Sequence, residues 1–81
     1  MSEQVLHRSR LGEQTLRNDA FNELYDQIIE ETVTQMLSLP PGHAKVAELH
    51  AEMVITQRIA TRFASWVEAG RMEVEKQQAT G

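Results

Sequence analysis

Residues 18–38 repeat apolar side chains in steps of three and one, which is the spacing of one face of a helix. Asn18 precedes this run and is a typical N-cap residue, and Asp19 places a carboxylate near the positive end of the helix dipole. Carboxylates recur with the same period on a second face, so the pattern predicts a helix over residues 18–38 with an apolar and an acidic side. The apolar set is Phe21, Leu24, Tyr25, Ile28, Ile29, Thr32, Val33, Met36 and Leu37, and the acidic face is Asp19, Glu23, Asp26 and Glu30.

The tetrapeptide at residues 39–42, Leu-Pro-Pro-Gly, ends this helix. Pro40 and Pro41 lack the amide hydrogen that a helix interior needs, and each disfavours a helical conformation in the residue before it. Gly42 adopts a positive φ at little cost. Because the connection is short, we expect the helices on its two sides to be antiparallel neighbours.

Residues 43–70 predict a second, longer helix, because no Pro or Gly interrupts them before Gly70. Gly70 is a typical C-terminal stop, and Arg71 beyond it suits the negative end of the helix dipole. Two apolar sets overlap on this helix, whereas one partner helix needs only one. The first set is Val46, Leu49, Met53, Ala60, Phe63 and Val67, and the second is Val54, Ile55, Ile59, Phe63 and Trp66.

The two ends of the chain read differently from the middle. Residues 1–17 carry too few apolar positions for a clear buried helical face, and this pattern predicts an N-terminal arm that orders on a partner, with a loose helix as the alternative. The polar composition of residues 75–81 predicts a tail that follows a hairpin spanning residues 18–74. The expected fold is therefore all-α, an antiparallel two-helix hairpin with a flexible N-terminal arm, completed by oligomerisation or by docking on a partner.

The surplus of apolar side chains on the second helix predicts an interaction surface. Two helices offer one seam, and several large apolar side chains left outside it form the kind of patch that marks an interface. Aromatic side chains are enriched at interface centres, although burial inside the hairpin explains Phe63 and Trp66 equally well. The expected interface residues are Val54, Ile55, Ile59, Arg62, Phe63 and Trp66.

Composition narrows the classes of protein. The 81 residues include no cysteine, which excludes disulfides and thiol chemistry. No apolar run reaches the length of a membrane span, and the first residues lack the features of a signal peptide. We therefore expect no membrane contact and a cytoplasmic location.

The net charge of −4 is concentrated in residues 18–41, which contain five carboxylates and no Lys or Arg. Arg58 and Arg62 lie one helical turn apart on the second helix. We expect them to pair with the acidic face, across the hairpin or between subunits, and a phosphate-binding face is the alternative.

Candidate chemistry is sparse. The carboxylates lack the Glu-x-x-His spacing of helical di-metal sites, and His43 and His50 read as surface residues, so we expect no metal and no cofactor. No nucleophile and base stand at motif spacing, and no glycine-rich phosphate loop is present, so we expect no enzyme. A less favoured hypothesis is nucleic-acid contact through the arm by Arg8, Arg10 and Arg17.

The order of these features resembles small helical accessory proteins of tailed bacteriophages. The resemblance rests on the aromatic-led acidic helix around residues 21–25, the Leu-Pro-Pro-Gly break and the helix that closes at Ala69 and Gly70. It implies a role in a virion or in head assembly, in the host cytoplasm or in the particle itself. No functional residue follows from it, because the pattern has no diagnostic motif.

Three hypotheses remain open from the sequence. The first is a non-enzymatic structural or assembly protein that associates with itself or with a larger assembly through its second helix. The second is a regulatory module that binds a host or phage protein through its acidic helix. The third is a packaging subunit that contacts nucleic acid through the arginine arm.

Overall fold

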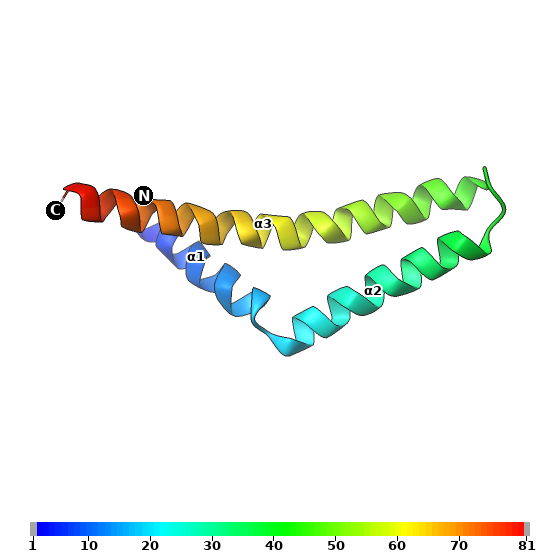
Figure 1. The fold of residues 1–81 in the computed structure, drawn as a ribbon, viewed down its shortest axis with the longest axis horizontal. Coiled ribbons are helices and arrows are strands. Elements are labelled where there is room, and N and C mark those ends of the chain that lie inside the picture. The colour runs from blue at the N-terminus through cyan, green and yellow to red at the C-terminus, as the bar shows by residue number, and fades with distance from the viewer. Residues whose placement is uncertain (1, 81) are drawn as a thin grey trace.

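The computed structural model describes residues 2–80, which form three helices and confirm the all-α prediction (Figure 1). The helices are α1 (Ser2–Leu16), α2 (Asp19–Ser38) and α3 (Ala44–Thr80). α1 and α2 follow one another along the long α3, and both run antiparallel to it. The result is a rod of 60 × 24 × 16 Å, only about two helices thick.

The prediction of a two-helix hairpin with a flexible N-terminal arm is wrong, because residues 2–16 form a helix that lies against α3. Met1 lies outside the described residues. The contact uses small side chains in place of a broad apolar stripe. A Cβ atom on Gly12 would lie 2.8 Å from the carbonyl oxygen of Phe63, and one on Gly70 would lie 2.1 Å from Oγ of Ser9. The absence of these side chains lets the two helices approach closely.

The junction between α1 and α2 is a hydrogen-bonded bend. Asn18 is the N-cap of α2, as predicted, and its Oδ1 accepts a hydrogen bond of 2.9 Å from the backbone N–H of Phe21. The side-chain amide of Asn22 donates to the carbonyl oxygens of Leu16 and Asn18. These bonds tie the last turn of α1 to the first turn of α2, so the bend is a defined structure.

The turn between α2 and α3 follows the prediction. Leu39 leaves the helical conformation with φ −97° and ψ 148°, and Gly42 has a φ of 82°, which favours glycine. His43 then serves the start of α3, because its ring Nδ1 accepts a hydrogen bond of 3.1 Å from the backbone N–H of Lys45. This bond satisfies one of the donors that a helix start leaves without an intrahelical acceptor.

The expected end of the second helix at Gly70 is wrong, because α3 continues to Thr80. Gly70 lies inside the helix and is buried where Ser9 of α1 crosses it. Residues 75–80, expected as a polar tail, form the last turns of α3, and Gly81 lies outside the described residues. Close helix packing therefore explains this glycine better than helix termination does.

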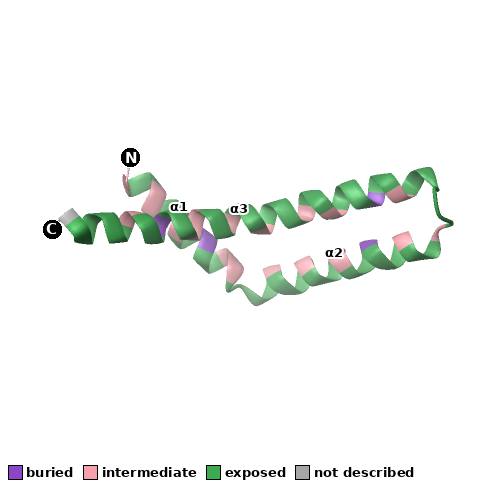
Figure 2. Cartoon of the chain, turned by 45° about the horizontal axis from the view of Figure 1, so that its top comes forward, coloured by how far each residue is buried: buried purple, intermediate pink, exposed green. Residues whose placement is uncertain are grey.

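The core of this rod is thin (Figure 2). Among residues 2–80, Leu49 is the one large hydrophobic side chain that is buried, at 4% exposure. Thr32 of α2 is also buried, and its hydroxyl donates to the carbonyl oxygen of Ile28. The other side chains along the α2–α3 seam are only partly covered. The two helices therefore meet along one line, and no third layer of the described residues covers that line.

Replacing Gly70 with Ala should weaken the crossing of α1 and α3, because the added methyl group would lie 2.2 Å from Cβ of Ser9. We expect Gly70→Ala to lower the free energy of unfolding by about 1–2 kcal/mol, since overpacking outweighs the preference of a helix for Ala over Gly. Urea unfolding followed by circular dichroism at one fixed protein concentration measures this difference.

Ser9→Gly supplies the matched control, because it removes the two atoms nearest the added methyl group. The two substitutions should therefore show a favourable coupling in a double-mutant cycle. A Gly70→Ala variant more stable than the wild type would contradict the close crossing.

Candidate interaction surface

A groove on α3 gathers most of the residues expected at an interface. Its lining is Ile55, Arg58, Ile59, Arg62, Phe63 and Trp66. These positions recur at three- and four-residue steps, so they form a continuous strip along one side of the helix. The structure thus places five of the six expected interface residues together and adds Arg58.

One end of the groove is fixed by aromatic contacts from the other helices. The rings of Phe63 and Trp66 meet edge to face with centroids 5.4 Å apart, and Phe21 of α2 meets Phe63 in the same way at 5.9 Å. The guanidinium carbon of Arg8 lies 5.6 Å from the centre of the Trp66 ring, which is a cation–π contact. Phe63 and Trp66 therefore support the fold of the single chain as well as lining the groove.

The middle of the groove is not covered by α1 or α2. Ile55 is 59% exposed and Ile59 is 50% exposed, although both are large apolar side chains. Arg58 and Arg62 are exposed beside them. Val54, the sixth expected interface residue, lines a neighbouring depression that shares both arginines. This stretch combines an apolar floor with two positive charges.

The acidic face of α2 is turned away from α3. Asp19, Glu23, Asp26 and Glu30 are all exposed. They lie on the opposite side of α2 from the half-buried ring of Phe21 and the buried Thr32, as their helical spacing requires. Within residues 2–80, no ion pair joins them to Arg58 or Arg62. The expected pairing across the hairpin is therefore absent there, and pairing between subunits stays a prediction.

The arginines of the N-terminal segment are held on α1. Arg8 contacts the Trp66 ring, and Arg17 forms an ion pair of 2.8 Å with Glu13. Arg10 lines a depression between α1 and α3 together with Glu13 and Arg71. These arginines therefore lie on a helix, where a carboxylate or an aromatic ring is close to each of them.

The turn end of the rod holds the two histidines of the second helical segment. His43 and His50 line a depression beside Met36 and Val46. His43 already uses Nδ1 for the start of α3. Across residues 2–80, no group of three or more acidic or histidine side chains is placed to hold a metal ion. Nor does any of the described helices combine the length and apolar character of a membrane span.

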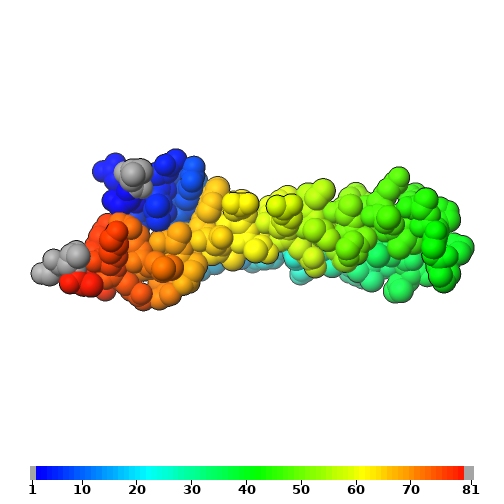
Figure 3. All heavy atoms as spheres, turned by 90° about the horizontal axis from the view of Figure 1, so that it is seen from above, coloured from blue at the N-terminus to red at the C-terminus, as the bar shows by residue number. Residues whose placement is uncertain are grey.

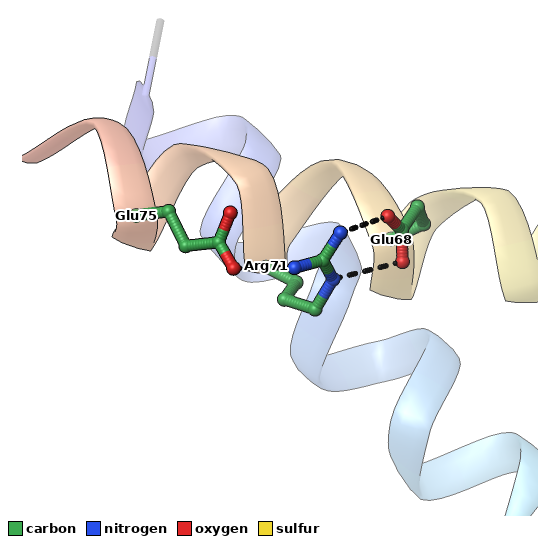
Figure 4. A network of polar contacts seen from close by, with 3 residues as sticks. All are labelled: Glu68, Arg71 and Glu75. Atoms are coloured by element: carbon green, nitrogen blue, oxygen red, sulfur yellow. Dashed lines mark hydrogen bonds and ion pairs between the residues drawn. The ribbon is translucent and has the colours of Figure 1, made fainter.

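A polar network lies on the C-terminal part of α3, where Arg71 stands between Glu68 and Glu75 (Figure 4). Its Nε donates to Glu68 at 3.1 Å, and its terminal nitrogens reach both carboxylates. The hydrogen bond from Arg71 holds the pKa of the Glu68 carboxyl below its ordinary value, and the bond with Glu68 and the nearby negative charges raise the pKa of Arg71. All three side chains are exposed, so the network adds little to stability and forms no buried site.

Sequence reasoning missed the contacts that α1 makes. Ser9 and Gly12 carry no apolar signal, and Gly12 and Gly70 resemble helix breakers. One sequence signal could have indicated a close helix crossing: Ser9 and Gly12 are small, lie three positions apart and occur in a segment without Pro. The role of Phe21 in holding Phe63 was likewise hidden, because periodicity shows that Phe21 faces a core without showing its neighbour.

Comparisons with protein-family models, with curated proteins and with solved structures find no match to this chain.

Removing Arg71 should change how Glu68 titrates. In Arg71→Gln, the pKa of Glu68 should rise toward its ordinary value of 4.5, because a shorter, neutral amide replaces the charged guanidinium that donates to it. Since folding lowers this pKa, the stabilising contribution is present above the unfolded value and disappears as the pH falls through the folded value. Carboxyl-carbon NMR titration of both proteins measures the shift.

An unchanged Glu68 titration in Arg71→Gln would show that the network does not persist in solution.

Proposed function

We propose that this protein is a non-enzymatic assembly component that works by helix–helix association through the groove on α3. The observation that carries the proposal is the contrast between the open groove and the thin core. Ile55 and Ile59 are at least half exposed, whereas Leu49 is the one large hydrophobic side chain that is buried among the described residues. Association would cover the groove and supply the missing layer.

The magnitudes support association. A large apolar side chain contributes roughly 1.5–3 kcal/mol when it is fully buried, against a total stability of about 5–15 kcal/mol for an ordinary domain. Chains of this length often need disulfides, metals or oligomerisation to reach that range. The sequence has no cysteine, so it has no disulfide to compensate for its thin core. The exposed large apolar side chains are Leu11, Leu24, Val33, Leu37, Val54, Ile55, Ile59, Met72 and Val74.

The elongated shape suits such a role. α3 supplies a continuous surface along most of a 60 Å rod, and seen from above it flanks α1 and extends past it (Figure 3). We propose that this surface is used in building a larger particle. The resemblance to bacteriophage accessory proteins suggests a virion or an assembling head in the host cytoplasm.

A second candidate function is a regulatory module that binds a basic protein surface through α2. The exposed carboxylates at Asp19, Glu23, Asp26 and Glu30, which no basic side chain of the described residues pairs with, favour it. The nucleic-acid hypothesis gains no such support, because Arg8 and Arg17 contact Trp66 and Glu13.

The test replaces the exposed floor of the groove. Ile55→Gln/Ile59→Gln should reduce the molar mass in solution toward the 9.2 kDa of one chain, because polar amides replace the apolar contact. Light scattering after size exclusion measures the mass. These two residues are better targets than Phe63 and Trp66, whose truncation would also remove contacts inside the chain.

Met72→Gln is the matched control, since Met72 is 58% exposed on the same helix and lies outside the groove. It should leave the mass unchanged. A wild-type chain that is monomeric throughout, or a groove variant that associates like the wild type, would contradict the proposal.

A further inference from the structure

The groove on α3 has a charge pattern that restricts what can occupy it. Arg58 and Arg62 are one helical turn apart, exposed, and without an ion pair among residues 2–80. The other lining residues are Ile55, Ile59, Phe63 and Trp66, so no carboxylate belongs to the groove itself. A fitting occupant would bring acidic side chains at helical spacing together with apolar ones.

Pairing of two α3 grooves does not meet this requirement. All six lining residues lie between positions 55 and 66. An antiparallel pairing of this strip with its own copy would place four arginines in one short interface, and like charges facing each other oppose association. The partner surface must therefore be a different one.

The outer face of α2 has the complementary pattern. Asp26 and Glu30 are four residues apart, which matches the separation of Arg58 and Arg62. α2 contains no Lys or Arg, so this face is uniformly acidic along its first three turns. After Glu30 the same face continues with Val33 and Leu37, and Leu37 is 82% exposed.

An antiparallel arrangement brings these features into register. With Glu30 of a second copy opposite Arg58, Asp26 falls opposite Arg62, because both pairs are separated by four residues. Val33 then falls opposite Ile55, since Val33 lies three residues after Glu30 and Ile55 lies three residues before Arg58. Antiparallel packing is also the relation that α2 and α3 have within the chain.

We infer that a second copy of this chain docks the outer face of its α2 into the α3 groove, with Asp26 and Glu30 facing Arg62 and Arg58. The inference rests on the proposed function and names the surface that performs it. Each copy offers one groove and one acidic face, so the contact joins two different surfaces and can repeat from one copy to the next. The apolar contacts then provide the affinity, and the charges set the register.

Charge reversal tests this pairing with three variants. The groove variant is Arg58→Glu/Arg62→Glu, and the acidic-face variant is Asp26→Lys/Glu30→Lys. Each should raise the dissociation constant for self-association by about tenfold or more, because like charges then face each other. The swap variant carries all four substitutions and should recover association close to that of the wild type. Sedimentation equilibrium measures all three.

The acidic-face variant separates this pairing from its competitor. If α3 associated with α3, reversing Asp26 and Glu30 would leave the dissociation constant unchanged, and the swap variant would fail to recover. Glu48→Lys/Glu52→Lys is the matched control, since both residues are exposed and one turn apart on α3, and it changes the net charge equally. It should associate like the wild type.

The outcomes separate two kinds of failure. A monomeric wild type contradicts the proposed function together with this inference. A self-associating wild type whose acidic-face variant is unaffected, or whose swap variant does not recover, overturns only the pairing. Circular dichroism confirms that each variant keeps its helices, as expected for substitutions at exposed positions.

Discussion

The structure depends on the fact that one helix can bury only one strip of its surface against another. α3 runs the whole length of the rod, and α1 and α2 share its single inner face one after the other. No further layer lies beyond them within residues 2–80, so the sides of α3 stay open. Leu49 is consequently the one large hydrophobic side chain of these residues that is buried, and Ile55 and Ile59 remain at the surface.

Features with a strong local cause could be predicted from the sequence. Pro40, Pro41 and Gly42 define the turn through backbone constraints alone, and Asn18 caps α2 through its own side chain. The two apolar sets on the second helix predicted more apolar side chains than one seam can cover, and Val54, Ile55 and Ile59 are indeed exposed. The groove residues could be named for the same reason, because helical spacing decides which side chains share a side.

Features that depend on a distant partner could not be predicted. Gly70 has the local character of a helix stop, but α1 crosses α3 there, and the missing side chain makes room for Ser9. Residues 2–16 were likewise predicted as an arm. Ser9 and Gly12 let α1 approach α3 closely, but they bury little apolar area, so no apolar pattern indicates the contact. Phe63 and Trp66 have two roles, since they hold α1 and α2 in place and also line the groove. The groove is thus built on a support that the single chain provides.

The central claim is that one copy is incomplete and that association supplies part of its stability. The most direct test is the temperature of half-unfolding of the wild-type chain, followed by circular dichroism over about a hundredfold range of protein concentration, because unfolding linked to dissociation depends on concentration. The account predicts that this temperature rises steadily with concentration. A single, concentration-independent transition would show that the three helices are stable alone, and it would contradict a role of association in stability.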